Sequence, residues 1–73
     1  MKRKEETEFL QSIGANIRRI REEKKIKQNK LAGLCEMENA NMSRVESGQA
    51  NMTMVTLLKI SKALDVPVLE LIK

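Results

Sequence analysis

The chain has 73 residues, and a chain of this length forms one domain with a small core. Its net charge is +4, and ten of its 14 lysines and arginines lie before residue 31, which points to a polyanion such as nucleic acid or an anionic membrane surface. Its single cysteine, Cys35, and its lack of histidine exclude an intrachain disulfide and provide no set of zinc ligands.

Neither a membrane span nor an export signal is evident. A helix that crosses a bilayer needs about 20 apolar residues in a row, and no stretch of the chain approaches this. The charged start at residues 1–4 is followed by Glu5, Glu6 and Glu8 instead of the apolar core of a signal peptide. With a free cysteine, this predicts a cytoplasmic protein that does not bind membranes.

The first third of the chain has the pattern of one amphipathic helix. Apolar residues recur at steps of three and four, which places them on one helical face. These residues are Leu10, Ile13, Ile17 and Ile20. The pattern predicts a helix over about 6–24, with Thr7 as a cap, after a charged tail at residues 1–5.

Two short helices are predicted next. Residues 28–35 place Leu31, Leu34 and Cys35 on one face of a two-turn helix, with Cys35 filling core space. Met42 and Val45 are at helical spacing within a second helix over about 38–47. Gly48 is suited to end that helix, because glycine readily adopts the left-handed conformation found there.

A longer helix follows Thr53, which is suited to cap it. Its apolar face is predicted to hold Met54, Leu57, Leu58, Ser61 and Leu64. Pro67 is well placed to begin a final short helix that carries Leu69 and Ile72. No strand-like alternation occurs. The sequence therefore predicts an all-α fold, a compact five-helix bundle, as one domain over residues 6–73.

The two short helices and their neighbours suggest a helix-turn-helix arrangement. The first needs a small residue where the second crosses it, and Ala32 provides one. The second has Met42 and Val45 as an inner face and a polar outer face. Asparagine can pair bidentately with adenine, and arginine with guanine. The outer face holds Asn39, Asn41, Ser43 and Arg44.

Residues 14–72 resemble the Cro and phage-repressor type of helix-turn-helix, the XRE family. The matching motifs are Gly14-x-x-Ile17-Arg18-x-x-Arg21, Gln28-x-x-Leu31-Ala32, Met42-Ser43-Arg44-Val45-Glu46-x-Gly48 and Leu57-Leu58-Lys59-Ile60-x-Lys62-Ala63-Leu64. Their order and spacing together are far more specific than any single motif. The resemblance implies a lambda-repressor-like fold and a transcriptional regulator that binds double-stranded DNA.

The resemblance also implies roles for individual residues. Gln28 would contact a DNA phosphate, the helix over 38–47 would read the major groove, and the segment after Gly48 would return to the backbone. Arg21 and Glu46 match a structural ion pair. The predicted DNA-binding residues are Lys27, Gln28, Asn39, Ala40, Asn41, Ser43, Arg44, Gln49 and Asn51.

Four positions depart from the family pattern. Glu36 stands where the turn usually has glycine, and a left-handed glutamate costs about 1 kcal/mol or more, so we expect an altered turn or one that is a residue longer. Glu38 replaces serine or threonine, and both glutamates would weaken non-specific DNA binding. Met52 replaces a frequent proline and Asp65 a frequent glycine.

Specific DNA affinity commonly needs two half-sites, so a homodimer is expected. The predicted interface consists of Val66, Val68, Leu69, Leu71 and Ile72. Two alternatives remain open: an antitoxin-type module whose main partner is a toxin, and a restriction-modification controller. An enzyme is not expected, because the chain shows no nucleophile beside a base, no phosphate loop and no metal-ligand cluster. No cofactor or metal is expected either.

Overall fold

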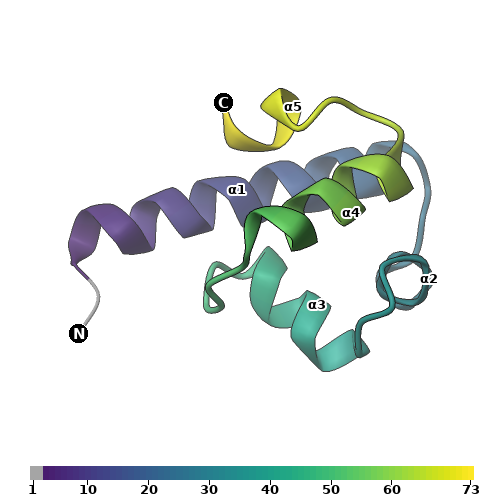
Figure 1. The fold of residues 1–73 in the computed structure, drawn as a ribbon, viewed down its shortest axis with the longest axis horizontal. Helices are drawn as coiled ribbons and strands as arrows, with labels where there is room; N and C mark the ends of the chain where they lie inside the picture. The colour runs from purple at the N-terminus through teal and green to yellow at the C-terminus, as the bar shows by residue number, and fades with distance from the viewer. Residues whose placement is uncertain (1–2) are drawn as a thin grey trace.

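The computed structural model describes residues 3–73, which form five α-helices without a strand (Figure 1). The helices are α1 (Lys4–Glu23), α2 (Gln28–Leu34), α3 (Asn39–Glu46), α4 (Met54–Leu64) and α5 (Leu69–Ile72). α1 runs along the length of the molecule; α3, α4 and α5 pack against it, and α2 packs against α3 and α4. The predicted all-α, five-helix architecture is confirmed. None of the helices in the described part of the chain is long and apolar enough to span a bilayer.

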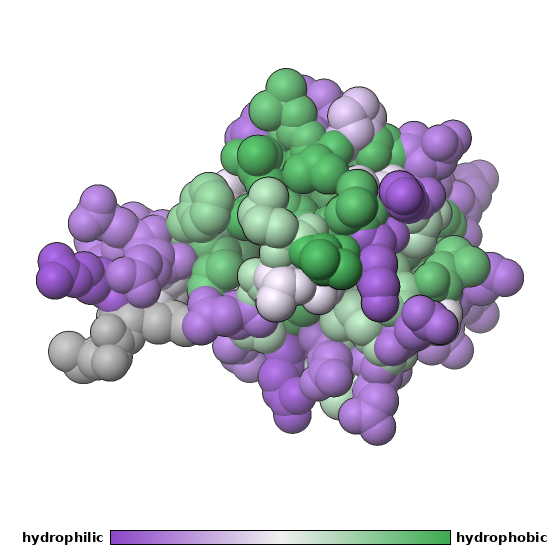
Figure 2. Space-filling view, in the orientation of Figure 1, coloured by the Kyte–Doolittle hydropathy of each residue, from purple (hydrophilic) through white to green (hydrophobic). Residues whose placement is uncertain are grey.

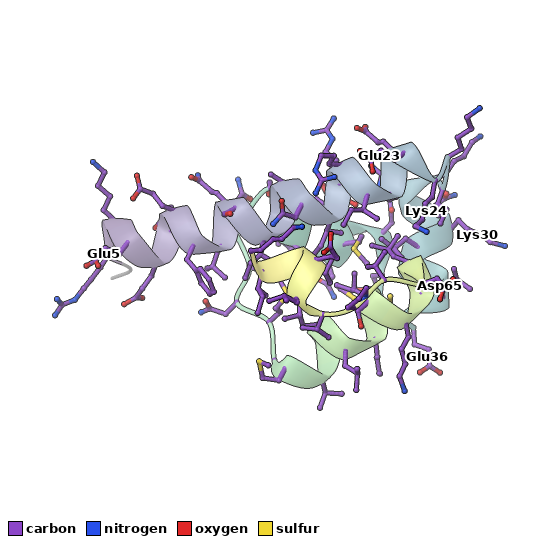
Figure 3. The ribbon with its side chains drawn as sticks, turned by 90° about the horizontal axis from the view of Figure 1, so that it is seen from above. Glu5, Glu23, Lys24, Lys30, Glu36 and Asp65 are labelled. Carbon is purple, nitrogen blue, oxygen red and sulfur yellow. The ribbon has the colours of Figure 1, made fainter. Side chains whose placement is uncertain are left out.

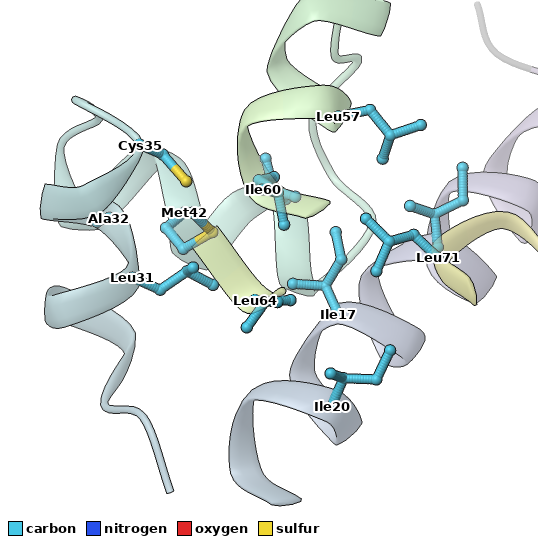
Figure 4. Packing of buried hydrophobic residues seen from close by; sticks show 12 residues of the cluster. Ile17, Ile20, Leu31, Ala32, Cys35, Met42, Leu57, Ile60, Leu64 and Leu71 are labelled. Atoms are coloured by element: carbon cyan, nitrogen blue, oxygen red, sulfur yellow. The ribbon is translucent and has the colours of Figure 1, made fainter. Parts of the chain in front are cut away.

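The core lies where the five helices meet, and each helix contributes at least one side chain with almost no exposed surface (Figure 4). Ile17 of α1, Met42 of α3 and Leu71 of α5 are completely buried. The sequence predicts that eight residues of the inner helix faces are buried together, and the buried cluster includes all of them: Ile17, Ile20, Leu31, Ala32, Met42, Val45, Leu57 and Leu64. Spacing along the helices was therefore sufficient to find the centre of the core.

The start of α1 differs from the prediction. The helix begins at Lys4, inside the segment expected to be a tail, and Arg3 is its N-cap without a capping side-chain hydrogen bond. Thr7 lies within the helix, and its N–H donates to the Arg3 carbonyl oxygen at 3.0 Å. Glu5 and Glu6 occupy the first turn, where negative charge interacts favourably with the helix dipole. Residues 1–2 of the predicted tail lie outside the described residues.

Some residues of the predicted apolar faces point outward. Leu34 ends α2 and is 54% exposed, because the two-turn helix turns Leu31, Ala32 and Cys35 to the core instead. On α4 the buried positions are Leu57, Ile60, Ser61 and Leu64, at the spacing of one helical face. Met54 and Leu58 fall outside that face and are 73% and 43% exposed.

Four helices end with the same backbone arrangement. Beyond the last turns of α1 to α4, one residue has a left-handed φ, and the N–H of the next residue donates back into that turn, as in a Schellman motif. Gly48 has this position after α3, as predicted. Residues with side chains have it after the other three helices: Lys25, Glu36 and Asp65.

The turn between α2 and α3 is therefore neither altered nor lengthened, and that expectation was wrong. Glu36 adopts a φ of 57°, and the Met37 N–H donates to the Ala32 carbonyl oxygen at 2.8 Å. Cys35, the residue before Glu36, is buried, and the hydrogen bonds of the turn fix the backbone on both sides. Glu36 therefore adopts the unfavourable left-handed conformation.

Candidate nucleic-acid interface

α3 has one buried and one exposed face. Met42, Val45 and Glu46 are buried against the other helices. The five α3 residues predicted to contact DNA are all exposed: Asn39, Ala40, Asn41, Ser43 and Arg44. The exposed face thus presents amide, hydroxyl and guanidinium groups to solvent, which are the groups that read base edges.

The exposed face is partly ordered by one internal hydrogen bond. Arg44 Nη1 donates to Asn41 Oδ1 at 2.8 Å, one turn earlier on the same helix. A guanidinium carries five N–H donors, so this bond leaves Arg44 with donors for a guanine edge. The bond aligns the Arg44 side chain along α3 instead of letting it extend freely into solvent.

α1 approaches the end of α3 closely at Gly14. A Cβ atom at this position would overlap with the carbonyl oxygens of Val45 and Glu46. The two backbones can therefore pack at this distance only because residue 14 has no side chain. Gly14 sets how deeply α3 sits against α1, and so how far its polar face projects.

Arg21 of α1 and Glu46 of α3 form a bidentate ion pair in the interior. Arg21 Nε lies 2.7 Å from Glu46 Oε2, Arg21 Nη2 lies 3.1 Å from Glu46 Oε1, and the two side chains are 11% and 4% exposed. Arg21 Nη1 also donates to the Ile26 carbonyl oxygen at 2.8 Å. No buried side-chain nitrogen or oxygen among the described residues lacks a partner. Both charges are therefore compensated, which a buried pair requires.

Gln28, the first residue of α2, joins this network. Its Nε2 donates to Glu46 Oε1 at 3.1 Å, and the residue is half-buried. The sequence analysis expected only a phosphate contact here and missed the bond to Glu46. Lys27, the preceding residue, is exposed. The Glu46 carboxylate thus connects the end of α3 with the segment predicted to hold phosphate.

A shallow hollow of about 380 Å³ lies between α3, the segment after Gly48 and the start of α4. Asn41, Arg44 and Asn51 line it, which brings three predicted DNA-binding residues together. Thr53 and Thr56 also line it, and the sequence analysis did not include them in the site. Thr53 accepts the Thr56 N–H at 3.1 Å and caps α4 as predicted. Gln49 is exposed but does not line the hollow.

Acidic side chains interrupt the basic surface near the loop between α1 and α2. Lys24 and Lys30 lie at the same end of the molecule as Glu23, Glu36 and Asp65, away from Glu5 (Figure 3). The exposed Glu36 carboxylate lies 3.7 Å from Lys59 Nζ, so its charge is partly compensated. The site is therefore indicated by the polar groups of α3 more clearly than by positive charge.

Cys35, which directly follows α2, is buried in the core. Burial raises the pKa of its thiol above the ordinary value of 9.0, and nearby Lys59 lowers it by a smaller amount. A neutral, buried thiol packs like a small apolar side chain. Residues 3–73 contain no group of three or more metal-ligating side chains that could hold an ion.

The predicted dimer interface needs one correction. Leu71 has no exposed surface, because its side chain packs into the core, so it cannot line an interface. Asn16 of α1 also holds α5 in place, with Nδ2 donating to the carbonyl oxygens of Leu71 and Lys73 at 3.0 Å. Val66 and Val68 are half-buried, and Leu69 and Ile72 are exposed.

Comparisons with known proteins agree with this geometry. A sequence model described as the Cro/C1-type HTH DNA-binding domain matches residues 16–73. The HTH-type transcriptional repressor RghR of Bacillus subtilis (strain 168) is 34% identical over 59 residues, which are 80% of this chain and 44% of that protein. The chain therefore spans less than half the length of this relative.

Solved structures are also similar. The restriction-modification controller protein C.AhdI from Aeromonas hydrophila superimposes with a TM-score of 0.82 at 35% identity, covering 85% of this chain and 94% of that one. The clp gene regulator ClgR from Corynebacterium glutamicum has a TM-score of 0.86 at 22% identity, covering 88% and 82%. The second likeness concerns the fold alone.

Proposed function

The chain belongs to the Cro/C1-type helix-turn-helix family of DNA-binding transcriptional regulators, and we propose that it acts in the cytoplasm as a homodimer with α3 of each copy in the major groove. The family and the fold are those of transcriptional regulators, which are not enzymes. One observation carries the proposal: α3 exposes only small and polar side chains while its inner face is anchored in the core.

In this proposal Asn39, Asn41 and Arg44 specify bases. Arginine reads guanine and asparagine reads adenine through paired hydrogen bonds. Ala40 and Ser43 are small enough to let α3 approach the base edges. Lys27, Gln28, Gln49 and Asn51 hold the phosphates on either side and set the register of α3 on the duplex.

Two copies would read two half-sites one helical turn apart, with roughly 34 Å between the paired recognition helices. A module of this size makes a limited DNA interface, so the second half-site supplies much of the affinity. The expected operator is therefore a short palindrome.

A binding selection on random duplexes tests the proposal. We expect an enriched palindrome, and we expect Arg44→Ala to relax the preference at one position of each half-site at a cost of about 1–3 kcal/mol. Lys27→Ala is the control: it should weaken all sequences about equally and reduce the salt slope by about one. No enriched motif at low salt would contradict sequence-specific regulation and favour a protein partner, such as the toxin of the antitoxin-type alternative.

A restriction-modification controller is the second candidate, and one observation favours it. The similarity to C.AhdI covers 94% of that chain at 35% identity, so the two proteins match over nearly their full described lengths. If this candidate is right, the selected palindrome should occur upstream of restriction and modification genes beside the gene for this chain. A phage operon in that place would contradict it.

A further inference from the structure

Within the described chain, Arg44 is the only charged side chain on the exposed face of α3. The other exposed residues of the helix are Asn39, Ala40, Asn41 and Ser43. Figure 2 shows mainly hydrophilic surface at the lower edge of the molecule, where α3 lies in Figure 1, and hydrophobic surface over α4 and α5. The placement of one guanidinium therefore decides where the charge of this face is directed.

Hydrogen bonds hold both the backbone and the side chain of Arg44. Its carbonyl oxygen accepts from the Gln49 N–H at 2.9 Å and from Ser47 Oγ at 3.1 Å. Its Nη1 donates to Asn41 Oδ1 at 2.8 Å. The ion pairs among residues 3–73 involve other cations, and the guanidinium of Arg44 is held by an amide instead.

The chemistry of the two groups fixes which atoms remain for DNA. A guanidinium only donates, so the oxygen of the Asn41 amide must face it, and both Nδ2 hydrogens stay free. With Nη1 engaged, Nε and Nη2 of Arg44 still form an edge of two parallel donors, which matches O6 and N7 of guanine. Asn41 keeps its Nδ2 donors and a second lone pair on Oδ1, so it can still pair with adenine.

We propose that Asn41 is a positioning residue for Arg44 and that the two side chains read neighbouring bases as one unit, an inference that rests on the proposed function. The preference for guanine at the base that Arg44 contacts then depends on Asn41 as well. Residues three apart rise about 4.5 Å along a helix, and base pairs are spaced roughly 3.4 Å apart. The two side chains therefore span about one base step.

The bond forms before DNA is bound, which lowers the cost of binding. An arginine side chain has many rotamers, and ordering it at an interface costs free energy that subtracts from the affinity. In water an exposed pair three residues apart on a helix is weak, so it orders Arg44 only in part. Beside the bases less water competes, and a hydrogen bond from a charged group becomes stronger. The effect of Asn41 on Arg44 is therefore larger in the complex than in the free protein.

Binding selections on random duplexes test the inference, with Arg44→Ala identifying the base that Arg44 contacts. Asn41→Ala should relax the preference for adenine at its own base and lower the preference for guanine at the Arg44 base at least about 3-fold. Asn41→Asp should keep the guanine preference within about 2-fold, because its carboxylate accepts from Arg44. It should lose the adenine preference, because it has no N–H donor.

Asn39→Ala is the matched control. Asn39 is an exposed amide on the same helix, and its side chain makes no hydrogen bond to Arg44 in the described chain. Its replacement should relax a different base and leave the guanine preference at the Arg44 base unchanged. Circular dichroism should show that all variants keep the helical content of the wild type, because each change lies at an exposed position.

The free protein provides a second measurement that does not depend on DNA. Rotation about the Nε–Cζ bond of Arg44 requires its hydrogen bond to Asn41 to break. This rotation should be about 2-fold slower in the wild type than in Asn41→Ala, since the pair is exposed and weak. The NMR signals of the arginine Nη groups report it, and Asn39→Ala should behave like the wild type.

The outcomes separate this inference from the proposed function. If Asn41→Ala relaxes only its own base, or if Arg44 rotates equally fast with and without Asn41, the inference is overturned and the proposed function stands. Loss of the guanine preference in Asn41→Asp, as in Asn41→Ala, would also overturn it. If the wild type selects no motif at low salt and Arg44 still rotates more slowly than in Asn41→Ala, the positioning role is supported and the proposed function is contradicted.

Discussion

Gln28 donates a hydrogen bond from Nε2 to Oε1 of Glu46 at 3.1 Å, which joins the first residue of α2 to the last residue of α3. The same oxygen accepts from Arg21 Nη2 at 3.1 Å. A primary amide has two N–H donors, so Gln28 keeps a second one for a phosphate. Glu46 therefore holds the orientation of the amide that is proposed to contact DNA.

This relationship predicts energetic coupling between Gln28 and Glu46 in DNA binding. Gln28→Ala should lower the affinity for all DNA sequences. The loss should be smaller in a Glu46→Gln background, because a glutamine at position 46 cannot accept the hydrogen bonds from both Arg21 and Gln28 as the carboxylate does. We expect a coupling energy of about 1 kcal/mol in a double-mutant cycle. As a control, Asn51→Ala and Glu46→Gln together should lose the sum of their separate losses in binding free energy. If Gln28→Ala and Glu46→Gln are additive as well, the predicted coupling is contradicted.

Loss of Glu46 should strongly destabilise the fold. Glu46→Ala leaves the buried Arg21 guanidinium without its carboxylate, which costs about 3–5 kcal/mol. Glu22→Ala is the control, because Glu22 pairs with Arg18 at 3.4 Å on the surface and such pairs contribute about 0–1 kcal/mol. Urea unfolding measures both variants. Similar midpoints would mean that the interior pair contributes little.

Gly14 and Gly33 should respond to alanine in opposite ways. At Gly14 the added Cβ meets two backbone carbonyls, which cannot move aside without displacing α3, so we expect about 1–3 kcal/mol of destabilisation. At Gly33 no atom lies within 4 Å of the added Cβ, and alanine should stabilise α2 by about 0.5–1 kcal/mol. Thermal unfolding of both variants checks this. Stabilisation by Gly14→Ala would mean that α1 and α3 are farther apart.

Replacing Glu36 with glycine should stabilise the protein. Its φ of 57° is unfavourable for a residue with a Cβ, and glycine removes about 1 kcal/mol of strain. Glu36→Ala is the matched control, since it also removes the charge and the contact with Lys59 but keeps the strain. Unfolding free energies should rank glycine above alanine. Equal values would show that the backbone is not strained at this position.

Cys35 should react slowly with iodoacetamide in the folded protein. Because burial raises the pKa of the thiol above 9.0, less of the reactive thiolate is present at any pH below that value than in the unfolded chain. The reaction should accelerate in urea, and the midpoint of the native pH profile should lie above that of the unfolded chain, because burial raises the pKa of the thiol. Native alkylation at pH 8 as fast as in urea would place the thiol at the surface.

Local sequence patterns determined most of the architecture. Helical spacing found Ile17, Met42 and Leu57, since a residue's position around a helix depends only on its neighbours in the chain. Thr53 and Gly48 mark helix ends through their own hydrogen bonding and backbone freedom. The exposed face of α3 could also be predicted, because it lies opposite the buried face that Met42 and Val45 define.

Only the tertiary structure decided what lies between helices. The bond from Gln28 to Glu46 joins residues 18 positions apart and depends on how α2 and α3 cross. Leu71 and Leu69 are both apolar, but the packing of α5 on α1 buries Leu71 and leaves Leu69 exposed. Phe9 and Met54 meet at one groove because α4 folds back beside α1. Contacts of this kind depend on how segments far apart in the sequence are placed in space, and the spacing of residues within one helix gives no information about this.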